Sequence, residues 1–270
     1  MKVPLHWLLS LVLVLVFSAG CQRSKAGITV AGSTSVEPFA ELLAEEYMRQ
    51  RPEAHVYVQG GGSTAGIVAT RTGAAHIGMS SRALLQGESD LYAVTVAKDA
   101  IAVIVHPKNP IHDLALNQIR QVFSGKIKSW DSLGGPSRPI ILVTREEGSG
   151  TREAFQKFVM GTEEIALEAL VQDSNGAIRQ VVSSDSNAIG YISLGLVDET
   201  VRAASISGVD PSLGNIEMGK YTFVRPFLFV FRGEPGGESK SFLDFVLGLE
   251  AQRMLVKEGL VSVFPRGAKK

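Results

Sequence analysis

The sequence predicts an α/β fold, because short apolar runs alternate with helix-like segments along most of its 270 residues. Short strand-like runs at 28–30, 56–58 and 77–79 are separated by segments whose apolar residues follow helical spacing. Strands that alternate with helices in this order build a mainly parallel sheet with helices packed against it. At this length the chain can bury a sizeable core without support from disulfides or metals.

Local patterns place the elements of the first hundred residues. A stripe of apolar residues along 36–50 predicts a helix. A shorter helix is expected over 65–72, where Gly73 is a stop signal. Two further strands are expected, over 92–97 and 100–106.

After Val105 the alternation continues, interrupted by prolines. The run over 221–231 is rich in β-forming residues but contains Pro226, which predicts an edge or crossover strand. A final helix is expected over 241–257, ended by Gly259. The other predicted elements are helices over 117–123, 152–160, 163–171 and 177–182 and strands over 140–143 and 188–192.

The first twenty residues are typical of a secretory signal peptide. A basic residue precedes an almost unbroken apolar run from Trp7 to Phe17, which is too short for a permanent membrane span. Cys21 follows Ala19-Gly20 and is the only cysteine, so no internal disulfide can form. This layout resembles the lipobox of bacterial lipoproteins, in which the cysteine is acylated, for example with palmitate. An ordinary signal peptide with an incidental cysteine is the alternative. We expect residues 1–20 to be the signal peptide and 21–26 a lipidated tether.

The charge balance limits the classes of binding partner that can be expected. Lys plus Arg and Asp plus Glu both number 27, so the formal net charge is zero. A broad surface for nucleic acid needs clustered excess charge, so no nucleic-acid partner is expected. A small positive site remains compatible with this composition.

Three clusters of glycine and hydroxyl residues stand directly before predicted helices, at 32–35, 60–64 and 148–151. Backbone N–H groups at a helix start lack partners within the helix, and glycine lets an anion approach them closely. Each cluster is therefore a candidate cradle for an oxyanion, although Ser and Thr also serve simply as helix caps. Each cluster also follows a predicted strand, and ligands of open α/β sheets bind beyond the carboxyl ends of strands.

Arg145 strengthens the ligand interpretation, since it follows a predicted strand and precedes the third cluster. A guanidinium can bind an oxyanion through two parallel hydrogen bonds. Glu147 could hold that guanidinium in place. A surface Arg–Glu pair is the alternative.

Four ordered motifs resemble one known family. They read Gly-Ser-Thr-Ser-Val-Glu-Pro at 32–38, Gly-Gly-Gly-Ser-Thr-Ala-Gly at 60–66, Ile-Gly-Met-Ser-Ser-Arg at 77–82 and Arg-Glu-Glu-Gly-Ser-Gly-Thr at 145–151. The set is similar to the substrate-binding lipoproteins of phosphate ABC transporters, and the similarity covers essentially the whole mature chain. It implies a two-lobed periplasmic-binding-protein fold of type II. Lobe 1 would comprise 27–104 and 222–270, and lobe 2 would comprise 105–221.

The same resemblance implies the function. Inorganic phosphate would bind between the lobes and pass to the membrane permease subunits of the transporter. The protein would be an exported monomer, periplasmic or at the cell surface, held to the membrane by its lipid anchor. No enzyme activity, cofactor or metal is expected. The implied phosphate ligands are Thr34, Ser35, Ser63, Ser81, Arg145, Ser149, Gly150 and Thr151.

Ser81 departs from part of the family, because longer members carry an aspartate at this position and shorter members often read Ser-Arg there. The carboxylates nearest to the motifs are Glu37, at the start of a helix, and Glu147. Whether Arg82 contacts the anion or braces the cleft is open at this stage.

Three alternatives to a phosphate carrier remain. A binding protein for sulfate, molybdate or tungstate would use similar chemistry. An exported phosphatase would need a nucleophile with a base or a metal cluster, and the five histidines are scattered. A phosphate-sensing surface protein could share the fold, because fold does not determine function.

The signal layout yields a first prediction. Cys21→Ser should give protein that is soluble or unprocessed, because the lipid would be the only retained membrane anchor. Intact mass and membrane fractionation of both proteins measure this. Equal fractionation, with no lipid mass on the wild type, would contradict acylation.

Overall fold

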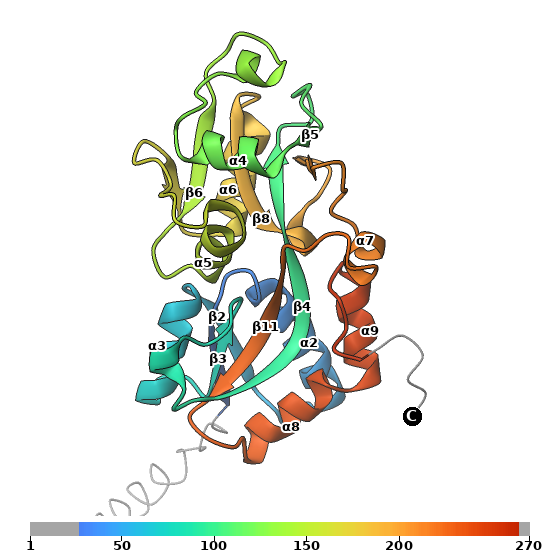
Figure 1. The fold of residues 1–270 in the computed structure, drawn as a ribbon. Helices are drawn as coiled ribbons and strands as arrows, with labels where there is room; N and C mark the ends of the chain where they lie inside the picture. The colour runs from blue at the N-terminus through green and yellow to red at the C-terminus, as the bar shows by residue number, and fades with distance from the viewer. Residues whose placement is uncertain (1–26, 265–270) are drawn as a thin grey trace, which may run out of the picture.

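The computed structural model describes residues 27–264, and Cys21 with the predicted signal and tether lies outside them. Two α/β lobes lie one above the other, and strands β4 and β11 run from one lobe into the other (Figure 1). The predicted two-lobed α/β architecture is confirmed. No helix within 27–264 is long and apolar enough to cross a membrane.

The chain builds most of lobe 1 first, then lobe 2, and returns to finish lobe 1. The first pass contains β1 Ile28–Gly32, α2 Glu37–Gln50, β2 Val56–Gly60, α3 Ser63–Thr72, β3 Ile77–Ser80 and η1 Gln86–Glu88, and β4 Tyr92–Val105 leads out of it. Lobe 2 contains β5 Asp113–Leu114, α4 Leu116–Phe123, η2 Trp130–Leu133, β6 Ile141–Arg145, α5 Gly150–Phe155, η3 Gln156–Met160, β7 Leu170–Gln172, α6 Asn175–Ser184, β8 Ala188–Ser193, η4 Leu194–Leu196, β9 Arg202–Ala203, β10 Ser205–Ile206 and α7 Leu213–Glu217. The return consists of β11 Val224–Phe231, α8 Gly237–Val246 and α9 Leu249–Lys257.

One sheet path runs through both lobes in the order β2-β1-β3-β11-β4-β8-β6-β7. Strand β1 is parallel to β2 and β3, and β6 is parallel to β7 and β8. The two crossing strands are antiparallel to their neighbours in this path. The sheet is therefore mixed, whereas a mainly parallel sheet was predicted, because β4 and β11 carry the chain between the lobes in opposite directions.

The two lobes have separate apolar cores. The lobe 1 core takes residues of β4 as far as Ala97 and residues of β11 from Phe227. The lobe 2 core takes β4 from Ala100 onward and includes Phe155, whose ring stacks on Tyr191 with centroids 3.8 Å apart. We infer that the chain passes between the lobes close to residues 98–99 on β4 and 225–226 on β11, rather than at 104/105 and 221/222.

Five predicted elements differ from the structure. The two strands expected over 92–106 are the single strand β4, since its residues pair in one lobe and then in the other. The helix expected over 152–160 begins at Gly150 and widens into π-type turns in η3. The segment 163–171 is not helical and ends in β7. The helix expected over 241–257 is divided at Gly248 into α8 and α9.

Pro226 lies inside β11, which has a neighbouring strand on each side, but it interrupts no hydrogen bonds between strands. It pairs with Lys98 of β4, while the pairing of β11 with β3 is confined to 228–230. Its missing N–H therefore falls on a side without a β partner. The prediction of a crossover position is confirmed, and the alternative of an edge strand is wrong.

Candidate functional site

The hydroxyl clusters meet where the lobes face each other. Strands β1, β2 and β3 end at this level in lobe 1, and β6 ends opposite them in lobe 2 (Figure 1). The side chains of Ser35, Ser63, Ser81 and Thr151 are all buried there. The carboxyl ends of the strands thus bring together motifs that are far apart in the chain. We call these four residues the hydroxyl cluster.

The lobe 1 half of the site is shaped by local turns and close packing. The backbone N–H of Ser35 donates to Ser33 Oγ (3.2 Å), which turns the chain between β1 and α2. Helix α3 lies close to β1 because Gly66 has no side chain: a Cβ there would lie 2.6 Å from the Cα of Gly32. Ser63, the first residue of α3, accepts a hydrogen bond from the Ser81 backbone (3.0 Å).

The lobe 2 half is the loop between β6 and α5. Ser149 caps α5, since its side chain accepts a hydrogen bond from the Arg152 backbone (3.3 Å). Gly150 lies against lobe 1, where a Cβ would overlap Ser63 Oγ and approach Ser81 Oγ to 2.7 Å. Thr151 Oγ1 reaches Ser35 Oγ across the interface at 2.8 Å. In this conformation the two halves are therefore in direct contact, and only glycine fits at position 150.

Arg145 is buried at the interface, with 1% of its surface exposed. Its guanidinium donates to both carboxylate oxygens of Glu146, each at 2.8 Å, and to the carbonyl of Asp173. It also donates to Thr34 Oγ1 in the opposite lobe (3.0 Å). Its Nη1 is buried without a hydrogen-bond partner. The partner carboxylate predicted from the sequence was wrong: Glu147 is exposed, and Glu146 holds the guanidinium.

A second guanidinium, that of Arg225, lies in the middle of the hydroxyl cluster. It donates to Thr151 Oγ1 (2.8 Å), Ser81 Oγ (3.2 Å) and Ser35 Oγ (3.2 Å). On its other side it forms an ion pair with Asp99 (2.9 Å). Three hydroxyls from both lobes thus share one cation, which the sequence motifs did not reveal.

The Arg225–Asp99 pair is fully buried, and this affects both groups. Burial raises the pKa of Asp99, while the charge of Arg225 and a hydrogen bond from Ser193 oppose the shift. Burial lowers the pKa of Arg225, and Asp99 opposes that shift. Burial imposes a desolvation cost on each ion, which the charge of its partner offsets together with the hydrogen bonds around the pair. We therefore treat the two as a coupled ion pair.

Asn175, the first residue of α6, also belongs to the site. Its Nδ2 donates to Ser35 Oγ (2.9 Å), and its Oδ1 accepts from the Ser193 backbone (3.1 Å). Sequence reasoning missed Asn175, Asp99 and Arg225. A signal existed for the last two, since each is a charged residue inside a largely apolar strand, and such charges are seldom buried unless they are paired.

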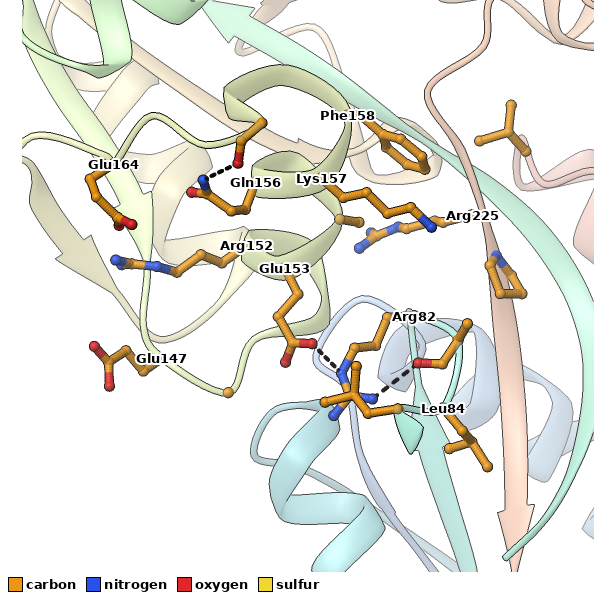
Figure 2. Close-up of a pocket in the computed structure, with 17 residues that line it drawn as sticks. Arg82, Leu84, Glu147, Arg152, Glu153, Gln156, Lys157, Phe158, Glu164 and Arg225 are labelled. Carbon is orange, nitrogen blue, oxygen red and sulfur yellow. Dashed lines mark hydrogen bonds and ion pairs between the residues drawn. The ribbon is translucent and has the colours of Figure 1, made fainter. Parts of the chain in front are cut away.

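A groove of about 910 Å³ runs along the interface beside the hydroxyl cluster (Figure 2). Helices α5 and η3 supply one wall, and the segment after β3 supplies another. Arg225 lines the groove and also contacts the cluster, so it lies between the two. Other charged groups in the groove are Arg82, Glu147, Arg152, Glu153, Lys157 and Glu164.

Two further expectations about side chains can be compared with the structure. Glu37 lies beside Gly60, and burial raises the pKa of its carboxyl. Neither it nor Glu147 contacts the hydroxyl cluster. Ser and Thr of the second cluster could have capped its helix, but the N-cap of α3 is Gly62, and Thr64 Oγ1 accepts from Arg82 (3.3 Å). The described residues hold no group of three or more His, Cys, Asp and Glu side chains that could bind a metal ion.

Comparison with known proteins gives consistent matches. The model of the PBP superfamily domain matches residues 19–250. The chain is 31% identical over 245 residues to the phosphate-binding protein PstS of Bacillus subtilis, covering 88% of this chain and 81% of that protein. A Clostridium perfringens chain, described as a phosphate ABC transporter substrate-binding protein with bound phosphate, is 41% identical with a TM-score of 0.85, covering 88% of this chain and 100% of that one. An ABC-type phosphate transport receptor from Vibrio cholerae is 37% identical with a TM-score of 0.72, covering 88% of this chain and 100% of that one.

The buried ion pair yields a prediction about stability. Arg225→Met should lower the free energy of unfolding by about 3–5 kcal/mol, because Asp99 is left as an uncompensated buried charge. Adding Asp99→Asn should recover a large part of that loss. Denaturant unfolding measures both variants, with Arg71→Met as the control, since Arg71 and its partner Asp90 are both exposed. An equal loss in the single and double variants would show that the pair is not coupled.

Proposed function

Because the chain belongs to the PBP superfamily, and within it to the substrate-binding proteins of phosphate ABC transporters, we propose that it binds inorganic phosphate between its lobes and delivers it to an ABC importer. Its relatives carry the name phosphate-binding protein, and the Clostridium perfringens structure contains phosphate.

One observation supports this function most strongly: donors from both lobes converge on one buried point. Arg145 has a buried N–H without a partner, and Arg225 brings a second guanidinium to the hydroxyls of Ser35, Ser81 and Thr151. A buried donor normally has an acceptor, so an unpartnered one at an interlobe site points to a ligand that accepts. A tetrahedral oxyanion offers acceptors in several directions. Its oxygens could replace the hydroxyl groups as the acceptors of these N–H donors. We propose the eight residues named from the sequence as ligands of this anion.

Export and anchoring belong to the same proposal. The signal layout and Cys21 support release to the periplasm or cell surface with a lipid anchor. The permease subunits of the importer would receive the anion when the lobes open. Family membership supports a binding protein rather than an exported phosphatase. The expectation of a monomer stays a prediction.

A different oxyanion, such as sulfate, is the second candidate ligand, and the arrangement of charges at the site supports it. Near neutral pH phosphate carries a proton that an acceptor can recognise, whereas sulfate carries none. The carboxylates at the cluster are already engaged, Asp99 by Arg225 and Glu146 by Arg145. No free carboxylate therefore contacts the cluster in residues 27–264, and discrimination against sulfate should be modest.

The binding proposal is tested first at Arg145. Arg145→Ala should weaken phosphate binding about ten- to hundredfold, because a charge-assisted contact contributes about 1.5–3 kcal/mol. Calorimetric titration of protein freed of phosphate measures the affinity, and Arg71→Ala is the control on an exposed surface. Unchanged affinity in Arg145→Ala would refute the assignment of the site.

Selectivity is tested at Ser81. Sulfate should compete measurably with phosphate in the wild type, and Ser81→Asp should reduce that competition, because a carboxylate there repels a fully deprotonated anion. Competition calorimetry at pH 6, 7 and 8 compares the two proteins. If a large excess of sulfate never displaces phosphate and Ser81→Asp changes nothing, another acceptor provides the selectivity.

A further inference from the structure

Arg82 forms a group of ion pairs beside the hydroxyl cluster without being part of it. Its side chain is 6% exposed, and none of its hydrogen bonds or ion pairs involves the hydroxyl cluster. The backbone on either side is fixed, since Ser80 Oγ both donates to the Arg82 carbonyl and accepts from the Arg82 N–H. The residue is therefore held firmly, but its contacts lie outside the proposed anion site.

One partner of Arg82 belongs to the same lobe. Its Nη1 and Nη2 donate to the two carboxylate oxygens of Glu88, at 2.7 and 2.9 Å. Glu88 is also nearly buried and accepts from the Leu85 backbone (2.7 Å). Hydrogen bonding to Arg82 lowers the pKa of Glu88, so the carboxylate stays charged. This part of the network does not depend on how the lobes are arranged.

The other partner belongs to the opposite lobe. Glu153 on α5 reaches down to Arg82, and its Oε2 lies 2.7 Å from Arg82 Nε (Figure 2). This contact is an ion pair across the interface between the lobes. Arg82 also supports Thr64, whose backbone N–H donates to the Gly148 carbonyl across the same interface (3.1 Å).

These contacts lie close in sequence to the residues that would hold the anion. Arg82 follows Ser81, and Glu153 is on the same helical turn as Thr151. Any movement that separates Ser81 from Thr151 must also separate Arg82 from Glu153. Arg82 keeps Glu88 after such a movement, so opening breaks one ion pair and leaves no buried charge unpaired.

We propose that Arg82 and Glu153 form a closure latch that sets how long the bound anion is retained, with Arg82 acting as a positioning residue that does not touch the anion. This rests on the proposed phosphate binding. The latch forms only when the lobes close, so it stabilises the closed state and slows release, while leaving the encounter with the open protein unchanged. Glu88 keeps the guanidinium in place for Glu153 to meet.

The test compares Glu153→Gln with the wild type. Release of radiolabelled inorganic phosphate is followed by rapid filtration after a chase with unlabelled phosphate, and association is measured separately. Glu153→Gln should raise the dissociation rate about three- to tenfold, as expected for loss of a partly buried ion pair, and leave the association rate within about twofold. The melting temperature of the phosphate-free protein should not change.

Glu164→Gln is the matched control, since Glu164 lines the same groove and forms no ion pair with another described residue. The double variant Arg82→Gln/Glu88→Gln removes the lobe 1 half and leaves unpaired only Glu153, whose side chain is 33% exposed. Adding Glu153→Gln to it should not accelerate release further. The latch is refuted if Glu153→Gln releases phosphate at the wild-type rate, if only association changes, or if the effects simply add. Wild-type protein that binds no phosphate would instead refute the proposed function.

Discussion

The ion pair between Arg225 and Asp99 is the contact on which the rest of the site depends. The two residues are direct cross-strand partners on β11 and β4, the strands that join the lobes. The carboxylate neutralises the guanidinium on one side, so that its remaining N–H groups can donate to hydroxyls of both lobes. Without Asp99 the cation would be too costly to bury, and without Arg225 the hydroxyls would lose their common donor.

This pair also explains how so polar an interface can be buried. Hydroxyls and amides are removed from water only where they find partners, and Ser35 shows the rule, with Thr151, Asn175 and Arg225 around its Oγ. The unpartnered Nη1 of Arg145 is an exception at the same interface. A buried donor without a partner, close to the hydroxyls that Arg225 holds, is what a site for an acceptor-rich ligand requires.

The arginines near the interface fall into two groups, one at the proposed anion site and one at the contact between the lobes. Arg225 lies on a crossing strand and donates to hydroxyls of both lobes, and Arg145 at the end of β6 donates to Thr34 of lobe 1. Arg82 faces the groove, with one carboxylate from its own lobe and one from the opposite lobe. We propose that these two arginines hold the anion and that Arg82 holds the lobes together. Family membership assigns the general task, and these contacts describe how this chain would perform it.

The sequence by itself determined the alternation of strands and helices and the three clusters at the carboxyl ends of strands. Those features follow from local apolar periodicity and from the conformations that glycine and hydroxyl residues favour. Only the tertiary structure decided which charges meet. Glu146 and Glu147 are neighbours in the chain, yet one holds Arg145 and the other is exposed. Arg225 and Asp99 are separated by 126 residues, and the non-helical segment 163–171 likewise ends in a strand that pairs with β6. Pairing of this kind depends on the register between strands and on burial, which local spacing does not encode.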